Sequence, residues 1–214
     1  MVVKNCEVHL GKSANTEIRY AFDSRSENNH MLLLGISGSG KSTQVEYMEA
    51  DIIKCGKKVI EFDFSDSSFA KNSLAAQSRI VNVRDDSSIS PLVKRCNAYG
   101  LTEKAVDFSK RITDVISGAL NFKPRQQAVL YGTIKEVAEQ YDQLSFKDIL
   151  AWLALNNDSS AESICTKLQY LADINIFGNY KTGGWRELFQ HQKPIQILSL
   201  SGFPPMERKI IAEL

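Results

Sequence analysis

The chain has 214 residues and a net charge of +1, with 26 Lys and Arg against 25 Asp and Glu, so overall charge gives no reason to expect a polyanionic partner. No apolar run approaches the length of a membrane-spanning helix, and the N-terminus lacks the apolar segment of a secretory signal. The four cysteines never form a Cys-x-x-Cys pair, which indicates a reduced, cytoplasmic protein.

The first 29 residues are expected to form an N-terminal β segment. Residues 2–10 alternate loosely between apolar and polar side chains and end at a Gly-Lys turn, and residues 17–22 indicate a second strand. Together they predict a hairpin. The polar residues 23–29 then lead as a loop into the next element.

The following stretch has the pattern of a phosphate-binding loop. Residues 32–34 are three leucines in a row, short enough for a buried strand. Four residues then follow at the spacing Gly-x-x-x-x-Gly-Lys-Ser, namely Gly35, Gly40, Lys41 and Ser42. Residues 42–55 lack Gly and Pro and carry apolar side chains at near-helical spacing, which predicts the helix that should follow such a loop.

The residue types in this loop suit the binding of a nucleotide phosphate. Glycines let the backbone wrap a phosphate chain, and the amides at the helix start form an anion-binding nest. Lys41, the predicted catalytic residue, would neutralise the β- and γ-phosphates. Ser42 would ligate Mg²⁺ and Thr43 would lie on the α-phosphate side. The predicted nucleotide contacts are Gly35, Ile36, Ser37, Gly38, Ser39, Gly40, Lys41, Ser42 and Thr43.

Residues 57–64 are expected to form the second strand of a βαβ unit, parallel to the first. Asp63 would then emerge at the carboxyl edge of the sheet, where ligands bind in such folds. It is the leading acidic candidate beside the nucleotide and a second candidate ligand of Mg²⁺. An equally good interpretation is a polar residue that starts a loop.

A mostly helical block follows a short strand at residues 79–83. Helices are expected over four stretches, namely residues 101–120, 125–141 with Pro124 at the first position, 145–155 and about 161–173. The block is too long for a simple crossover, so it is interpreted as an insert on the core. Residues 178–184 are expected to form a plain turn.

The last part of the chain predicts a short helix at residues 185–189, a core strand at 194–200 and a helix from Met206. The expected fold is therefore α/β, with a mostly parallel sheet of the P-loop NTPase kind. The expected domains are an N-terminal β segment (1–29), a core that is incomplete at its C-terminus (30–100 and 178–214) and a helical insert (101–177).

One catalytic feature is missing from the sequence. A hydrolysing P-loop enzyme also needs an acidic residue at the end of an apolar strand, to hold Mg²⁺ and polarise water. Residues 59–63 come nearest, but Glu61 interrupts the apolar run, and the strand at 195–200 is followed by a serine. Nucleotide binding does not require this residue, so the sequence predicts binding more strongly than hydrolysis.

The order of these pieces resembles the HerA/FtsK superfamily of P-loop ATPases, especially its HerA-like and conjugation-type branches. Besides the phosphate loop, the likeness rests on residues 9–12, 59–63, 89–92, 124–130, 146–153, 161–177 and 195–203, and it covers most of the chain. Ser90 stands where that family has Asn. The phosphate loop is the one sharply specific motif among them.

The resemblance implies ATP and Mg²⁺ as ligands, and a hexameric ring that translocates DNA, unwinds it or drives other macromolecular transport. Relative to the family, the chain ends before the acidic strand, so the resemblance implies the front part of a motor. Two other hypotheses remain open. One is a nucleotide-gated binding protein without hydrolysis, and the other is a small P-loop kinase with Asp63 as its acidic partner.

Overall fold

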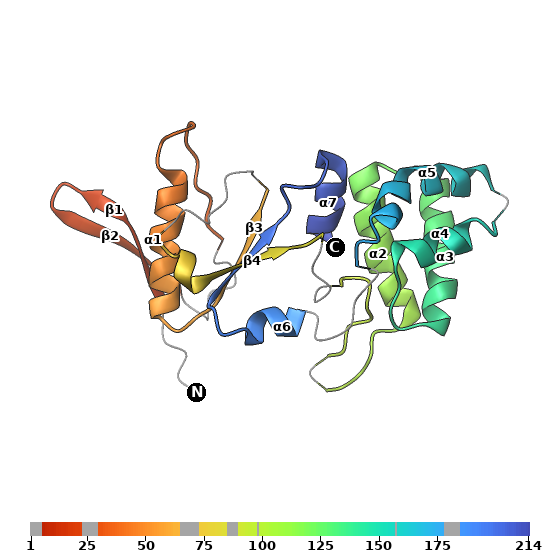
Figure 1. Cartoon of the computed structure of the whole chain (residues 1–214), viewed down its shortest axis with the longest axis horizontal. Helices are drawn as coiled ribbons and strands as arrows, with labels where there is room; N and C mark the ends of the chain where they lie inside the picture. The colour runs from red at the N-terminus through yellow and green to blue at the C-terminus, as the bar shows by residue number, and fades with distance from the viewer. Residues whose placement is uncertain are drawn as a thin grey trace. The chain divides into compact units, whose positions relative to one another are not determined.

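The computed structural model describes residues 6–22, 30–64, 73–84, 90–97, 99–156, 158–177 and 185–214. They divide into two compact units, and most of their elements are labelled in Figure 1. We call the first the α/β unit; it contains the described residues up to Asp63, with 73–81 and 191–198. The second, the helical unit, contains the described residues of 64–66, 82–190 and 199–214. The domain boundaries expected from the sequence stay a prediction.

The predicted N-terminal hairpin is confirmed. Strand β1 (Cys6–Ser13) pairs antiparallel with β2 (Thr16–Phe22), from Cys6 opposite Phe22 to Ser13 opposite Thr16. The register shifts between His9 and Gly11, which marks a β-bulge. The part of the expected first strand that precedes Cys6 lies outside the described residues.

Helix α1 (Lys41–Lys54) is held on two sides within the α/β unit. Toward the hairpin, the His9 backbone N–H donates to the Asp51 carboxylate at 3.0 Å, and the Gln44 side chain donates to the His9 carbonyl at 2.6 Å. On another face, Ala50 and Ile53 pack against a core formed by Leu74, Ile195 and Ile197. The predicted amphipathic helix therefore forms, with polar anchors on one side and apolar packing on the other.

Three strands form the sheet of the α/β unit, in the order β3 (Val59–Asp63), β5 (Ile195–Ser199) and β4 (Ser78–Asn82), with a 3₁₀ turn (Ala75–Gln77) before β4. The strands run parallel, as predicted. Residues 195–198 of the central strand are all buried, as expected for a strand with neighbours on both edges. The predicted α/β class of P-loop NTPases is confirmed.

The strand predicted at residues 32–34 does not form. Residues 30–36 have no ladder partner among the described residues, and the side chains of Leu32, Leu34 and Ile36 are 79%, 82% and 83% exposed. A strand state depends on hydrogen bonds from neighbouring strands, and an apolar run cannot supply these by itself. The prediction of a buried strand before the phosphate loop was therefore wrong for the described chain.

The helical unit contains α2 (Ala105–Leu120), α3 (Pro124–Gln140), α4 (Phe146–Leu153), α5 (Ser159–Asp173), α6 (Trp185–Gln190) and α7 (Pro205–Glu213). Helix α2 packs on α3 and α7, and α3, α4 and α5 pack on one another. Their apolar faces supply fully buried side chains, among them Phe108, Ile112, Ile116, Leu130, Ile134, Phe146, Ile149, Leu153, Ile164 and Leu168. No helix in the described part of the chain has the length and apolar content needed to cross a bilayer.

Local signals account for most helix starts in this unit. Ser145 caps α4, because its hydroxyl accepts from the Asp148 N–H at 3.2 Å while the Asp148 carboxylate accepts from the Ser145 N–H at 2.8 Å. Asp158 caps α5 by accepting from the Ser160 N–H at 2.7 Å. Pro124 is the first residue of α3, as predicted.

Helix α2 begins four residues later than predicted. Thr102 bridges to Cys96, and the Glu103 N–H donates to the Arg95 carbonyl at 2.7 Å, so residues 101–104 belong to a folded-back loop. Val106, in the first turn of the helix, is exposed. The turn expected at residues 178–184 lies outside the described residues.

Candidate nucleotide-binding site

The predicted phosphate loop runs directly into the first turn of α1. Gly40 is the residue before the helix and has φ 84° and ψ 13°, a left-handed conformation that glycine adopts without a steric penalty. No side chain caps the first turn, and the turn contains no acidic residue. Its backbone N–H groups and the positive end of the helix dipole are thus suited to an anion.

The loop before the helix is a tight turn. The Ser39 N–H donates to the Ile36 carbonyl at 3.2 Å, and Gly38 has φ 77°. At Gly35, an added Cβ atom would lie 2.4 Å from the Ser39 hydroxyl oxygen, so a larger residue would force Ser39 to move. Gly38 and Gly40 adopt backbone conformations that favour glycine, and Gly35 allows Ser39 to approach closely.

Lys41 reaches back over the loop. Its ammonium group donates to the Gly35 and Ile36 carbonyls, both at 2.7 Å. These two hydrogen bonds place the positive charge of Lys41 beside the Gly35–Gly40 turn, which leads into α1. An ammonium has three N–H donors, so this geometry leaves one for a phosphate oxygen, and the carbonyl contacts can be exchanged for phosphate contacts.

The remaining residues predicted to contact the nucleotide lie close together because they are near one another in the chain. Ile36, Ser37, Ser39, Ser42 and Thr43 all lie on the exposed side of the loop or of the first helical turn. The Ser42 hydroxyl is therefore accessible for a metal that a phosphate chain would carry. The role of these residues in nucleotide binding stays a prediction.

Asp63 is the last residue of β3, at the carboxyl end of the strand as expected, but its side chain is buried. Burial raises the pKa of Glu61 on the same strand, and the charges of Glu49, Asp63 and Glu46 add to this shift. Asp63 therefore belongs to a group of carboxylates between β3 and the phosphate-loop helix. Its proposed contact with Mg²⁺ remains untested.

Sequence reasoning missed this group, which we call the α1–β3 carboxylates (Glu46, Glu49, Glu61 and Asp63). Glu49 is only 4% exposed, and one of its carboxylate oxygens has no hydrogen-bond partner in the described structure. Burial, with a further contribution from Glu46, raises its pKa to about 7. Burial and the three neighbouring carboxylates raise the pKa of Glu61 to about 7 as well.

A signal for Glu49 was present in the sequence. It lies four residues before Ile53, which packs on the core, so the helical repeat places the two on the same face. Among the described residues, no three Asp, Glu, His or Cys side chains form a group that could hold a metal ion. Within the α1–β3 carboxylates, burial therefore favours the protonated forms of Glu49 and Glu61.

Comparison with known protein families shows to which family this chain belongs. Residues 8–214 match the family model described as Helicase HerA, central domain. The chain belongs to the HerA central-domain family. It is an ATPase module of the HerA/FtsK superfamily, so the resemblance inferred from the order of the sequence elements is confirmed. No individual curated protein matches the chain.

In this HerA-family chain, replacing Gly40 by alanine should both destabilise the α/β unit and weaken nucleotide binding. An L-residue at φ 84° costs about 1 kcal/mol, and relief of this strain would turn the first amides of α1 away from the phosphate. Thermal unfolding and calorimetric titration with MgATP measure the two effects.

Gly118→Ala is the matched control, because Gly118 lies inside α2 and an added Cβ meets no atom within 4 Å. There the same substitution should stabilise by about 0.5–1 kcal/mol and leave MgATP affinity unchanged. Equal behaviour of the two variants would contradict the assigned role of Gly40.

Proposed function

We propose that this chain is the ATP-binding module of a HerA/FtsK-like DNA translocase or helicase-type ATPase. One observation supports this most strongly: the tight Gly35–Gly40 turn leads through a left-handed Gly40 into an uncapped helix, with the Lys41 ammonium folded over the turn. The family membership gives the site its context.

In this proposal the α1 amides and Lys41 bind the β- and γ-phosphates of ATP, and Lys41 also stabilises the charge that develops during phosphoryl transfer. Ser42 holds Mg²⁺ together with phosphate oxygens, and Asp63 is the nearest candidate to assist from the end of β3. Thr43 lies on the α-phosphate side. Bound Mg²⁺ would supply charge neutralisation for the transferred phosphoryl group.

Family membership also supports self-association, with a hexameric ring and DNA as the proposed assembly and substrate. Such a motor requires groups that polarise the attacking water and couple neighbouring subunits. Within the described residues, Asp63 at the end of β3 is the only acidic residue to which we assign such a role. Catalysis by a ring would therefore depend on how copies of the chain come together.

The test is to measure MgATP binding and phosphate release by the chain, with and without duplex and single-stranded DNA. DNA-stimulated hydrolysis supports the motor. Tight binding without any turnover would instead favour a nucleotide-gated binding protein, and transfer of the γ-phosphate to a small molecule would favour a kinase. Absence of MgATP binding would overturn all three hypotheses.

A further inference from the structure

Two cysteines of the α/β unit, Cys6 and Cys55, belong to elements that pack on each other. Figure 1 shows the red β1–β2 hairpin alongside the orange helix α1, and β1 contacts this helix. Cys6 is the first residue of β1 and is 1% exposed, whereas Cys55 directly follows α1 and is partly exposed. Both thiols are free. Neither side chain takes part in the proposed nucleotide site.

Hydrogen bonds between β1 and α1 fix the direction in which the two elements pass each other. The Gln44 side chain donates to the His9 carbonyl at 2.6 Å, and the His9 N–H donates to the Asp51 carboxylate at 3.0 Å. His9 is therefore level with the middle of α1. Since the N–H of a residue precedes its carbonyl along a strand, the start of β1 lies toward the end of the helix.

The spacings along the two elements bring Cys6 and Cys55 to the same level. Cys6 precedes His9 by three residues, which is about 10 Å along a strand. Cys55 lies about 11 Å along the helix beyond the midpoint between Gln44 and Asp51. Gln44, Asp51 and Cys55 are separated by seven and four residues, so they share one stripe of the helix, the stripe that faces β1.

The interaction of the two thiols agrees with this placement. Burial is the main cause that raises the pKa of Cys6 to about 11, and a hydrogen bond with the Cys55 side chain adds to the shift. A hydrogen bond requires that its two groups be neighbours. Cys6 therefore stays a neutral, enclosed thiol at neutral pH, and Cys55 is the more accessible sulfur of the two.

We propose that Cys6 and Cys55 are a redox-sensitive pair, in which a hydroperoxide converts the two thiols to a disulfide that fastens the β1–β2 hairpin to the end of α1. Disulfides that form transiently in otherwise reduced proteins are usually redox-sensing. The bond closes the chain between residues 6 and 55, a loop that contains the phosphate loop. Because it restricts the unfolded chain, it stabilises the α/β unit.

The oxidation takes place in two steps. The Cys55 thiolate attacks one peroxide oxygen, the O–O bond breaks, and the departing hydroxide takes up the Cys55 proton to become water. Cys55 is then a sulfenic acid. The Cys6 sulfur attacks the Cys55 sulfur, the S–O bond breaks, and the Cys6 proton leaves with the hydroxide as a second water. The thiol pair loses two electrons, and hydrogen peroxide gains them.

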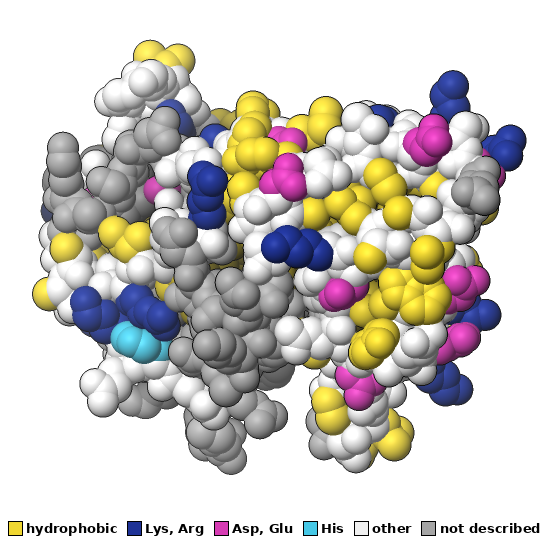
Figure 2. All heavy atoms as spheres, turned by 45° about the vertical axis from the view of Figure 1, so that its right-hand side comes forward, with side chains coloured by type: hydrophobic (Ala, Val, Ile, Leu, Met, Phe, Trp, Pro, Cys, Tyr) yellow, Lys and Arg dark blue, Asp and Glu magenta, His cyan; other side chains and the backbone are white. Residues whose placement is uncertain are grey.

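A competing oxidation would join two copies of the chain through the exposed Cys96. Figure 2 shows Lys, Arg, Asp and Glu side chains interspersed on the visible face of the helical unit, and the net charge is only +1. Repulsion between like charges therefore does not keep copies apart. The experiment accordingly uses the full chain with Cys96→Ser at low protein concentration, and Cys165 on α5 serves as the internal reference.

The first measurement identifies the bond. The reduced Cys96→Ser protein is treated with hydrogen peroxide, its free thiols are counted, and its disulfides are mapped by mass spectrometry of a non-reduced digest. The thiol count should fall from three to one, with Cys6 linked to Cys55 and Cys165 still free, and dithiothreitol should restore all three. Absence of this bond, or a bond from either residue to Cys165, overturns the proposal.

The second measurement concerns stability. The oxidised protein should unfold about 5–10 °C above the reduced protein, because the disulfide restricts a long loop of the unfolded chain. Cys55→Ser should remove this difference between the oxidised and reduced forms, and so should Cys6→Ala, which serves if the first variant folds poorly. Cys165→Ser should preserve it. Equal unfolding temperatures of the two forms would show that the bond does not fasten the hairpin.

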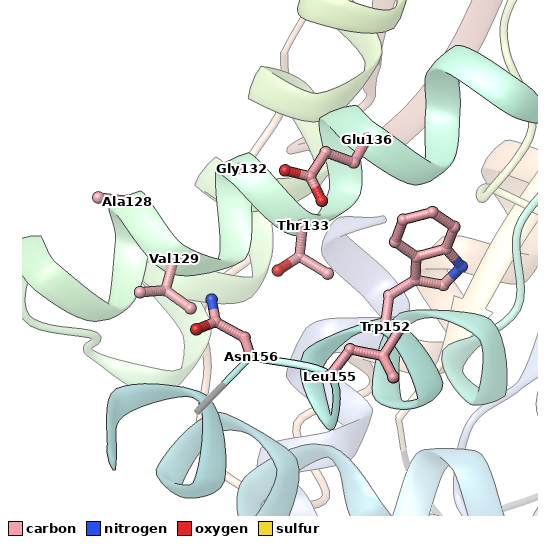
Figure 3. Close-up of a pocket in the computed structure, with 8 residues that line it drawn as sticks. All are labelled: Ala128, Val129, Gly132, Thr133, Glu136, Trp152, Leu155 and Asn156. Atoms are coloured by element: carbon pink, nitrogen blue, oxygen red, sulfur yellow. The ribbon is translucent and has the colours of Figure 1, made fainter. Parts of the chain in front are cut away.

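Hydrogen exchange locates the effect within the molecule. Backbone amides of β1, β2 and α1 should exchange more slowly in the oxidised protein. Helices α3 and α4 are the reference; Figure 3 shows the pocket of about 450 Å³ between α3 and the end of α4, with Thr133 and Glu136 on one side and Trp152 on the other. Exchange in α3 and α4 should be unchanged, and slowing there without slowing in β1 and α1 contradicts the proposal. None of these measurements uses MgATP, so their failure is distinct from failure of the nucleotide site.

Discussion

Replacing Lys41 by alanine is expected to weaken MgATP binding by about 2 kcal/mol or more, roughly 30-fold in Kd, or to abolish it. The Lys41 ammonium lies 2.7 Å from the two carbonyls that begin the phosphate loop, where it is placed to meet the β- and γ-phosphates. Its loss removes a charge-assisted contact that no other described side chain of the loop can replace. Isothermal titration with MgATP measures the change.

The same substitution should alter the stability of the protein without nucleotide by less than about 1 kcal/mol, because the Lys41 hydrogen bonds are exposed to solvent. Lys54→Ala, at the other end of α1 and paired with Asp51, is the matched control and should bind MgATP normally. An unchanged Kd in the Lys41→Ala protein would refute the assignment of the phosphate loop.

Replacing Glu49 by glutamine is expected to stabilise the α/β unit above pH 7. The folded state raises the pKa of Glu49 from an ordinary value of 4.5 to about 7, chiefly by burial. A carboxyl whose pKa is raised by folding stabilises fully below pH 4.5, and this contribution is lost as the pH rises through 7. The shift corresponds to about 3 kcal/mol, which glutamine removes by being neutral at every pH.

Urea unfolding at pH 5.5 and at pH 8 measures this prediction. The wild-type protein should lose stability between the two values, whereas Glu49→Gln should lose less, with Glu61 accounting for part of the remaining slope. Glu7→Gln is the control, because Glu7 is exposed on β1 of the same unit. If Glu49→Gln and Glu7→Gln show the same pH dependence, Glu49 is not a buried, destabilising charge.

Sequence reasoning succeeded where a few consecutive residues carry the whole signal. The turn at Gly35–Gly40 and the start of α1 follow from glycine conformations and uncapped amides within ten residues. The capping box at Ser145 and the Pro124 start of α3 are equally local. The parallel partner predicted for β3 was the stretch at residues 32–34, which forms no strand, so the neighbour that β3 has in the sheet, β5, was not predicted.

The α1–β3 carboxylates could not be predicted with the same certainty. The helical repeat places Glu49 on the face of Ile53, but whether that face meets apolar groups or Glu61 depends on which strand packs there. The pKa of a carboxyl responds to burial and to neighbouring charges, and both come from residues remote in sequence.

The sequence by itself determined the HerA-type phosphate loop and most of the helices with their starts, since these depend on contacts within a few residues. The tertiary structure alone decided that residues 32–34 lie outside the sheet and that residues 101–104 fold back onto residues 95–97. It also placed Tyr99 in solvent and Glu49 in the interior. Each of these depends on whether a partner from elsewhere in the chain satisfies a backbone group or covers a side chain.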